Sequence, residues 1–235
     1  MNLPNYLTVT RIIIVPLMVV VLLTPFAEEV FGVTRYALAI VLFLTAAVTD
    51  FFDGHLARKR NQVSKLGILL DPVADKLLVS AALIALVEKQ LAPAWTVVII
   101  LGREFVVTGL RSIAASDGVI ISANMTGKIK MWAQCVAIVS LMVVGANTLP
   151  PVTNAGQVLP SLRFWELPEV QTAIQHLFSF SLNGNDWRVF GYLIGRAALW
   201  VAVITSIWSM FEYFALFRRA DRERKLAEAA SVSEI

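Results

Sequence analysis

Long apolar stretches separated by short polar segments dominate the chain. A helix needs about 20 mostly apolar residues to cross a bilayer. The stretches that reach this length are residues 7–26, 35–53, 68–88, 93–114, 127–148 and 189–216. The pattern predicts an all-α polytopic membrane protein with six transmembrane helices. We expect the first stretch to be a retained membrane helix and not a secretory signal, because Arg11 interrupts it and no basic region precedes it.

The remaining segments are polar and differ in character. We expect one membrane catalytic domain over residues 1–217, followed by a charged cytoplasmic tail at 218–235. The connection 149–188 contains Pro, Asn and Gly, and we expect an extracytoplasmic excursion with one short amphipathic helix near 166–180. The role of this excursion cannot be read from the sequence.

The composition agrees with a membrane protein. Hydrophobic residues make up 57% of the chain and charged residues 16%, against about 25% charged in soluble domains. The single cysteine, Cys135, excludes an intramolecular disulfide and a cysteine-based zinc site. The basic residues border apolar segments and form no stripe interleaved with aromatic residues, so nucleic acid is not an expected partner.

The distribution of basic residues predicts the topology. Cytoplasmic connections carry an excess of Lys and Arg. Here the excess falls on every second connection and on the C-terminal tail, at Arg58, Lys59, Arg60, Lys65, Arg111, Lys128, Lys130, Arg218, Arg219, Arg222, Arg224 and Lys225. This alternation places both termini, and the segment between the second and third stretches, in the cytoplasm.

Four aspartates near the ends of apolar segments carry the chemistry. Asp50 and Asp53 are three residues apart on the second stretch, and Asp71 and Asp75 are four apart on the third, so each pair shares a helix face. The short basic connection predicts that the two helices are antiparallel neighbours with both pairs at one depth. Carboxylates at membrane depth need a compensating charge, and divalent cations supply it. The sequence therefore predicts a metal site in the membrane domain.

The same residues resemble a known family. Asp50, Asp53, Gly54, Ala57, Arg58, Gly67, Asp71 and Asp75 match every fixed position of the signature of the CDP-alcohol phosphatidyltransferases. The resemblance implies a six-helix fold in the bacterial inner membrane, a homodimer, and two divalent ions, Mg²⁺ or Mn²⁺, held by the four aspartates. It further implies that Asp50 and Asp71 bridge the ions and that Asp75 is the general base.

The resemblance also implies the substrates. Asp53, Gly54, Ala57, Arg58 and Gly67 would line the pocket of a CDP-linked lipid, CDP-diacylglycerol. The segments NLPNYLTVTR and GREFVVTGLRSIAASDGVIISANMTGKIKMWAQ resemble the branch that uses glycerol 3-phosphate, which gives phosphatidylglycerophosphate and CMP. The first segment adds Asn5 and Thr8 to the CDP-binding candidates, although ordinary helix capping explains them equally well.

An anionic acceptor calls for cations near the metals. Arg103 and Arg111 are eight residues apart, about two helical turns, so one face can carry both. Lys128 is the third candidate for binding the acceptor's phosphate, and Lys128 and Lys130 cannot both point inward from one helix. The alternatives are anchoring at the membrane surface for Arg111 and Lys128, and a packing pair with Glu104 for Arg103.

Two other functions remain open at this stage. Serine or inositol phosphate could replace glycerol 3-phosphate as the acceptor in the same reaction. A divalent-metal or proton-coupled transporter would also place acids inside a helical bundle. The chain shows no internal repeat, and its acids lie near one end of their segments, which favours the enzyme.

Overall fold

The protein is a bundle of long helices. The structure is a computed structural model that describes residues 3–60, 65–116, 125–146 and 164–233, and all the regular secondary structure in these ranges is helical. The elements are α1 (Leu3–Leu23), α2 (Phe26–Phe31), α3 (Arg35–Arg60), α4 (Lys65–Glu88), α5 (Ala94–Ser116), α6 (Met125–Gly145), the 3₁₀ turn η1 (Phe164–Glu166), α7 (Pro168–Phe178) and α8 (Gly184–Ser233).

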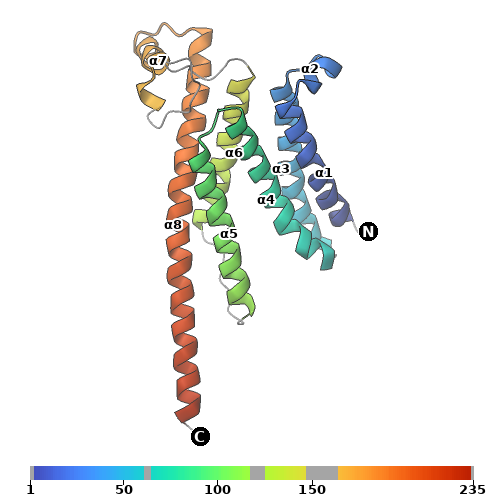
Figure 1. The fold of residues 1–235 in the computed structure, drawn as a ribbon, viewed down its shortest axis with the longest axis vertical. Helices are drawn as coiled ribbons and strands as arrows, with labels where there is room; N and C mark the ends of the chain where they lie inside the picture. The colour runs from blue at the N-terminus through green and yellow to red at the C-terminus, as the bar shows by residue number, and fades with distance from the viewer. Residues whose placement is uncertain (1–2, 61–64, 117–124, 147–163, 234–235) are drawn as a thin grey trace.

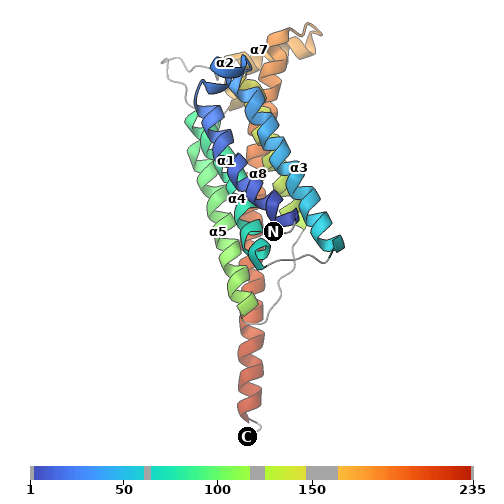
Figure 2. The same ribbon diagram turned by 90° about the vertical axis from the view of Figure 1, so that its right-hand side faces the viewer.

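The long helices alternate in direction. Helices α1, α4 and α6 run toward the end of the bundle that carries α2 and α7, and α3, α5 and α8 run away from it (Figures 1 and 2). The last turn of α3 and the first turn of α4 therefore lie at the same end as the start of α1 and the last turn of α8. This alternation is the one that the distribution of basic residues predicts.

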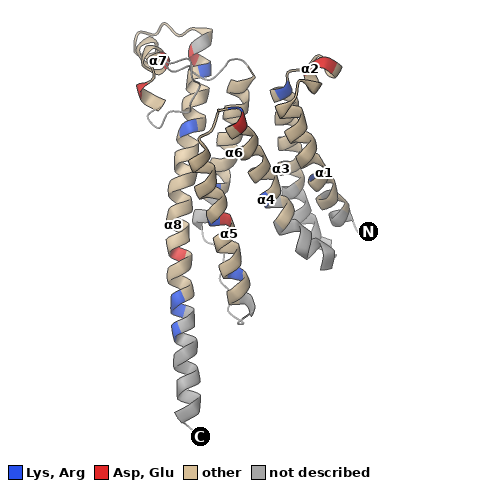
Figure 3. Cartoon of the chain, in the orientation of Figure 1, with Lys and Arg blue, Asp and Glu red and all other residues tan. Residues whose placement is uncertain are grey.

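Charged side chains follow the same division. In the described part, the acids of α2, η1, α7 and the first turn of α8 gather at the α7 end of the bundle (Figure 3). The opposite end, toward which α5 and α8 run, carries Arg111 near the end of α5 and Arg218, Arg219 and Arg222 in the second half of α8. The two ends of the bundle therefore differ in charge, as expected if they face different sides of a membrane.

All six predicted segments form separate long helices, but their bounds differ from the prediction. Helices α3 and α8 continue well beyond 53 and 216, because the polar residues that follow are also good helix formers and nothing interrupts them. Helix α1 ends before 26, and the short helix α2 occupies a segment predicted as a loop. By length and composition, one helical segment of the described part, Asp186–Arg219, is long and apolar enough to cross a membrane.

The reversal between α2 and α3 is fixed by one ion pair and one glycine. Gly32 ends α2 with a φ of +63°, in the left-handed region that glycine adopts without strain. Two nitrogens of the Arg35 guanidinium donate to the two carboxylate oxygens of Glu28, at 2.9 and 2.8 Å. These hydrogen bonds hold the pKa of Glu28 below its ordinary value.

The excursion before α8 contains the predicted amphipathic helix. Helix α7 buries Val170 and Ala173 and packs against the first turns of α8. His176 lies 3.1 Å from Asp186 through its Nδ1 atom, and Asp186 also accepts a hydrogen bond from the backbone N–H of Asn183. His176 is therefore part of the junction between α7 and α8.

Helices α6 and α8 share the most extensive interface of the described part. A glycine makes their close approach possible: a Cβ atom at Gly195 would lie 2.8 Å from side-chain atoms of Leu141 and 3.3 Å from its backbone nitrogen. Small residues at helix interfaces allow this distance in membrane proteins. The position of α8 relative to α6 therefore depends on the absence of a side chain at residue 195.

We expect Gly195→Ala to lower the thermal unfolding midpoint in detergent. The added methyl group must displace Leu141, which costs about 1–3 kcal/mol. Gly102→Ala is the matched control, because a Cβ there meets nothing within 4 Å and alanine favours a helix by about 1 kcal/mol. Equal midpoints for the two variants would contradict the proposed role of Gly195.

Candidate active site

The four aspartate positions lie on two helices that contact each other. Asp50 and Asp53 are on α3, and Asp71 and Asp75 are on α4. Counted at 1.5 Å per residue, they lie about 9–15 Å from the adjoining ends of the two helices, which are at the same end of the bundle. The backbone thus agrees with the predicted common depth, while the four side chains lie outside the described part of the structure.

The carboxylates at these positions are suitable ligands for divalent metal ions. Carboxylate oxygens are the ligands that Mg²⁺ and Mn²⁺ prefer, and two contacting helices offer four carboxylates at one depth. Among the described side chains, no group of three or more His, Cys, Asp or Glu residues could hold a metal ion. The metal prediction therefore rests on Asp50, Asp53, Asp71 and Asp75.

The predicted nucleotide-binding residues lie on α3 and α4, which carry the aspartates, and on the neighbouring helix α1. Gly54, Ala57 and Arg58 follow the aspartates on α3, and Gly67 precedes Asp71 on α4. Asn5 and Thr8 belong to α1, which packs against both α3 and α4. Of the six, only Thr8 has a described side-chain environment, and it is buried.

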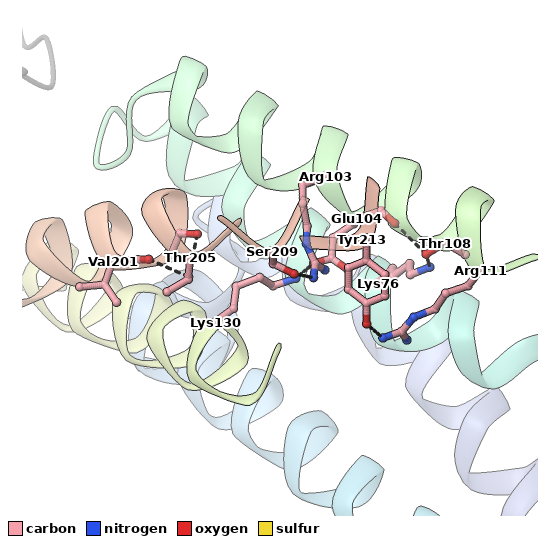
Figure 4. A network of polar contacts seen from close by, with 11 residues as sticks. Lys76, Arg103, Glu104, Thr108, Arg111, Lys130, Val201, Thr205, Ser209 and Tyr213 are labelled. Carbon is pink, nitrogen blue, oxygen red and sulfur yellow. Dashed lines mark hydrogen bonds and ion pairs between the residues drawn. The ribbon is translucent and has the colours of Figure 1, made fainter. Parts of the chain in front are cut away.

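A network of polar side chains connects α4, α5, α6 and α8 (Figure 4). Lys76 Nζ donates to Thr108 Oγ1 on α5, and Thr108 in turn donates to the backbone carbonyl of Glu104. Because Lys76 follows Asp75 directly, its Cα is about 3.8 Å from that of the fourth aspartate. The network therefore begins next to the predicted metal site.

Glu104 is the acid at the centre of this network. Its Oε1 atom pairs with Lys130 Nζ on α6 and lies 3.3 Å from Arg103 Nη1. Arg103 and Lys130 are both buried, and buried cations are stable only when a counter-charge compensates them. The packing pair between Arg103 and Glu104, one of the two interpretations that the sequence left open, is thus present, and Lys130 shares it.

Arg103 and Arg111 share one face of α5, as their spacing predicts. Both guanidinium groups lie over the ring of Tyr213 on α8, with their Cζ atoms 5.8 and 4.8 Å from its centroid. Arg111 Nη2 also donates to the Tyr213 hydroxyl, and Arg103 Nη2 donates to Ser209 Oγ. The structure therefore brings the two arginines together, through residues of α8.

The network contains residues that the sequence did not identify as site candidates. Lys130 points inward, whereas the sequence indicated Lys128, whose side chain lies outside the described part. Ser209 and Tyr213 are four residues apart and so share a helix face, which is the only signal that could have indicated them. That signal is weak, because serine and tyrosine are common in membrane helices.

Residues 1–208 match the sequence model of a family described as CDP-alcohol phosphatidyltransferase, so the chain belongs to this family. Three curated bacterial relatives carry the name CDP-diacylglycerol–glycerol-3-phosphate 3-phosphatidyltransferase. The protein of Bacillus subtilis is 50% identical over 91% of this chain and 94% of its own. The protein of Rickettsia felis is 37% identical over 62% of this chain and 77% of its own. The protein of Shigella flexneri is 30% identical over 92% of this chain and 95% of its own. The resemblance that the aspartate motif indicates is confirmed.

We expect Glu104→Gln to destabilise the protein. The amide keeps the shape of the side chain but leaves Arg103 and Lys130 without their shared carboxylate, at a cost of about 2 kcal/mol. Glu28→Gln removes a carboxylate from the exposed pair with Arg35 and should change the unfolding midpoint much less. Thermal unfolding of both variants in detergent measures the difference, and equal losses would show that Glu104 has no special role.

Proposed function

We propose that this protein transfers the phosphatidyl group from CDP-diacylglycerol to glycerol 3-phosphate, giving phosphatidylglycerophosphate and CMP. Family membership and the names of relatives that align over most of the chain support this reaction. The observation that carries the choice of acceptor is the cationic network next to Asp75. An alcohol with a phosphate group needs such cations, whereas serine does not.

The acceptor's phosphate would bind to the cations of α5 and α6. Arg111 is largely exposed and is held over Tyr213, so its guanidinium is accessible to a ligand. Arginine suits this role because its planar fork donates two parallel hydrogen bonds to a phosphate. Arg103 and Lys128, the other two predicted candidates, and Lys130, which the structure adds, would complete the site.

Asp50, Asp53, Asp71 and Asp75 would hold two divalent ions, Mg²⁺ or Mn²⁺. When bound, these ions would neutralise the pyrophosphate of the donor and stabilise the departing CMP. Gly54, Ala57, Arg58 and Gly67, with Asn5, Thr8 and Asp53, would line the CDP pocket. The small residues on α3 and α4 leave room for the nucleotide close to the backbone.

Asp75 would act as the base for the transfer step. Its carboxylate would accept the proton of the acceptor's hydroxyl, and that oxygen would attack the phosphorus that carries diacylglycerol. The bond between this phosphorus and the CMP oxygen would break in line with the attack. Orientation of the acceptor by the cations of α5 and α6 would bring its hydroxyl to this phosphorus.

We further propose that the six long helices cross the bacterial inner membrane, with both termini in the cytoplasm and the protein acting as a homodimer. Large apolar side chains are exposed along the outer faces of the bundle, among them Ile13 on α1, Val41 on α3, Phe105 on α5 and Phe211 on α8. A lipid environment explains such extensive apolar exposure. The apolar sequences of α4 and α5 are interrupted by charged residues of the proposed site, among them Asp71 and Asp75 on α4 and Arg103 and Arg111 on α5.

Release of CMP from CDP-diacylglycerol by the purified protein tests the acceptor. We expect release with glycerol 3-phosphate and Mg²⁺ or Mn²⁺, and a rate at least about 100-fold lower with serine, which has no phosphate for these cations to bind. Inositol phosphate, which does carry a phosphate, is compared in the same assay. Faster release of CMP with serine or inositol phosphate would show that this alcohol, and not glycerol 3-phosphate, is the acceptor. Metal flux into proteoliposomes without CMP release would favour a transporter.

We expect Asp71→Asn to lower CMP release by at least about 100-fold, because the amide removes a charge from the proposed metal site. Asp186→Asn changes an aspartate at the opposite end of the bundle and should retain near wild-type turnover. Removal of divalent ions with EDTA should abolish wild-type activity, and Mg²⁺ or Mn²⁺ should restore it. Full turnover by Asp71→Asn would exclude Asp71 from the site.

A further inference from the structure

Helix α8 contributes two buried polar side chains to the network, and both lie just beyond the region that matches the family. The family match ends at residue 208, and Ser209 and Tyr213 follow it. Ser209 is 1% exposed and Tyr213 is 3% exposed, so neither offers a surface to bulk solvent. Both instead contact the arginines of α5, more than 100 residues earlier in the sequence.

Tyr213 contacts both arginines at once. Its hydroxyl accepts a hydrogen bond from Arg111, and its ring lies beneath the guanidinium groups of Arg111 and Arg103. The face of an aromatic ring is electronegative, so the ring attracts both groups and reduces the cost of placing two like charges together. Ser209 Oγ accepts a hydrogen bond from Nη2 of Arg103 and so restricts the orientation of this guanidinium.

Arg103 retains one unused donor in this arrangement. Its Nη1 atom lies 3.3 Å from Glu104 and its Nη2 atom donates to Ser209, but its buried Nε atom has no hydrogen-bond partner among the described residues. A buried donor of a charged group without an acceptor is costly. An anionic oxygen of a ligand would satisfy it, which is a second indication that an anion binds here.

We propose that Tyr213 is a positioning residue for the acceptor's phosphate. It holds Arg103 and Arg111 in one orientation before the acceptor arrives, and Ser209 supports it at Arg103. Without the hydroxyl of Tyr213, the guanidinium of Arg111 must be ordered at the moment of binding, which weakens binding of the acceptor. This inference rests on the proposed function, because it assumes that the two arginines bind the phosphate of glycerol 3-phosphate.

The test compares Tyr213→Phe with Tyr192→Phe. Tyr192 is an ideal match, because it lies on the same helix, is equally buried, and accepts a hydrogen bond from Arg196 at 3.0 Å. Arg196 also lies over the Tyr192 ring, with its Cζ atom 5.6 Å from the centroid. The two substitutions therefore remove the same kind of hydrogen bond, but only one lies in the proposed site.

We expect Tyr213→Phe to raise the KM for glycerol 3-phosphate by about threefold to tenfold, the effect of having to order one long side chain on binding. The KM for CDP-diacylglycerol and kcat should change by less than about twofold, since the hydroxyl does not contact the donor. The inhibition constant of inorganic phosphate, competing with glycerol 3-phosphate, should rise by the same factor as the KM. Tyr192→Phe should leave all of these values near those of the wild type.

Ser209→Ala provides a second variant in case Tyr213→Phe fails to fold, as judged by its unfolding midpoint. It should raise the same KM by a smaller factor, because Arg103 keeps its contact with the Tyr213 ring. An unchanged KM in both variants, or an equal shift in Tyr192→Phe, would overturn the positioning role while leaving the proposed function intact. A wild-type protein inactive with glycerol 3-phosphate would instead overturn the proposed function and, with it, this inference.

Discussion

The compensation of buried charge is the constraint on which the site depends. Taking a cation out of water costs several kcal/mol unless an anion or a set of acceptors replaces the lost hydration. Glu104 supplies that replacement for Arg103 and Lys130, which come from different helices. A single carboxylate therefore joins α5 to α6, and among the described side chains of the network cations remain in excess. That excess is what an anionic substrate requires.

Helix α8 connects the packing of the bundle to this chemistry. It lies against α6 over a long interface, and against α5 where Ser209 and Tyr213 reach the arginines. The close contact at Gly195 is about 21 Å along the helix from Ser209 and about 27 Å from Tyr213. The packing of Gly195 against Leu141 is therefore one of the contacts with α6 and α5 that together position these two side chains.

Much of the fold could be predicted from the sequence, because long apolar runs and the alternation of basic connections depend only on local composition. The helix ends were less predictable. Residues that favour helix continue past the apolar part of α3 and α8, and hydropathy does not detect them. The aspartate motif was identifiable because its spacing is fixed within two adjacent helices.

The cationic network on α5, α6 and α8 was harder to predict from the sequence. The shared face of Arg103 and Arg111 follows from their spacing, and the structure confirms it. Tyr213 could not be predicted, because its partners are about 100 residues away and only the packing of α5 on α8 brings them together. The choice between Lys128 and Lys130 likewise depends on the rotation of α6 about its axis, which the short polar start of that helix does not define.

The division of the site between helices has a consequence for specificity. Under the proposed function, the chemistry of the CDP-linked donor would belong to α3 and α4, which carry the aspartate motif, and a change there would affect every acceptor. The side chains that orient Arg103 and Arg111 come instead from α8, at positions beyond the family match. Among the described residues, α8 makes no interface with α3 or α4. Under the proposed function, a substitution at Ser209 or Tyr213 would therefore act on binding of the acceptor and leave the helices of the aspartate motif in place.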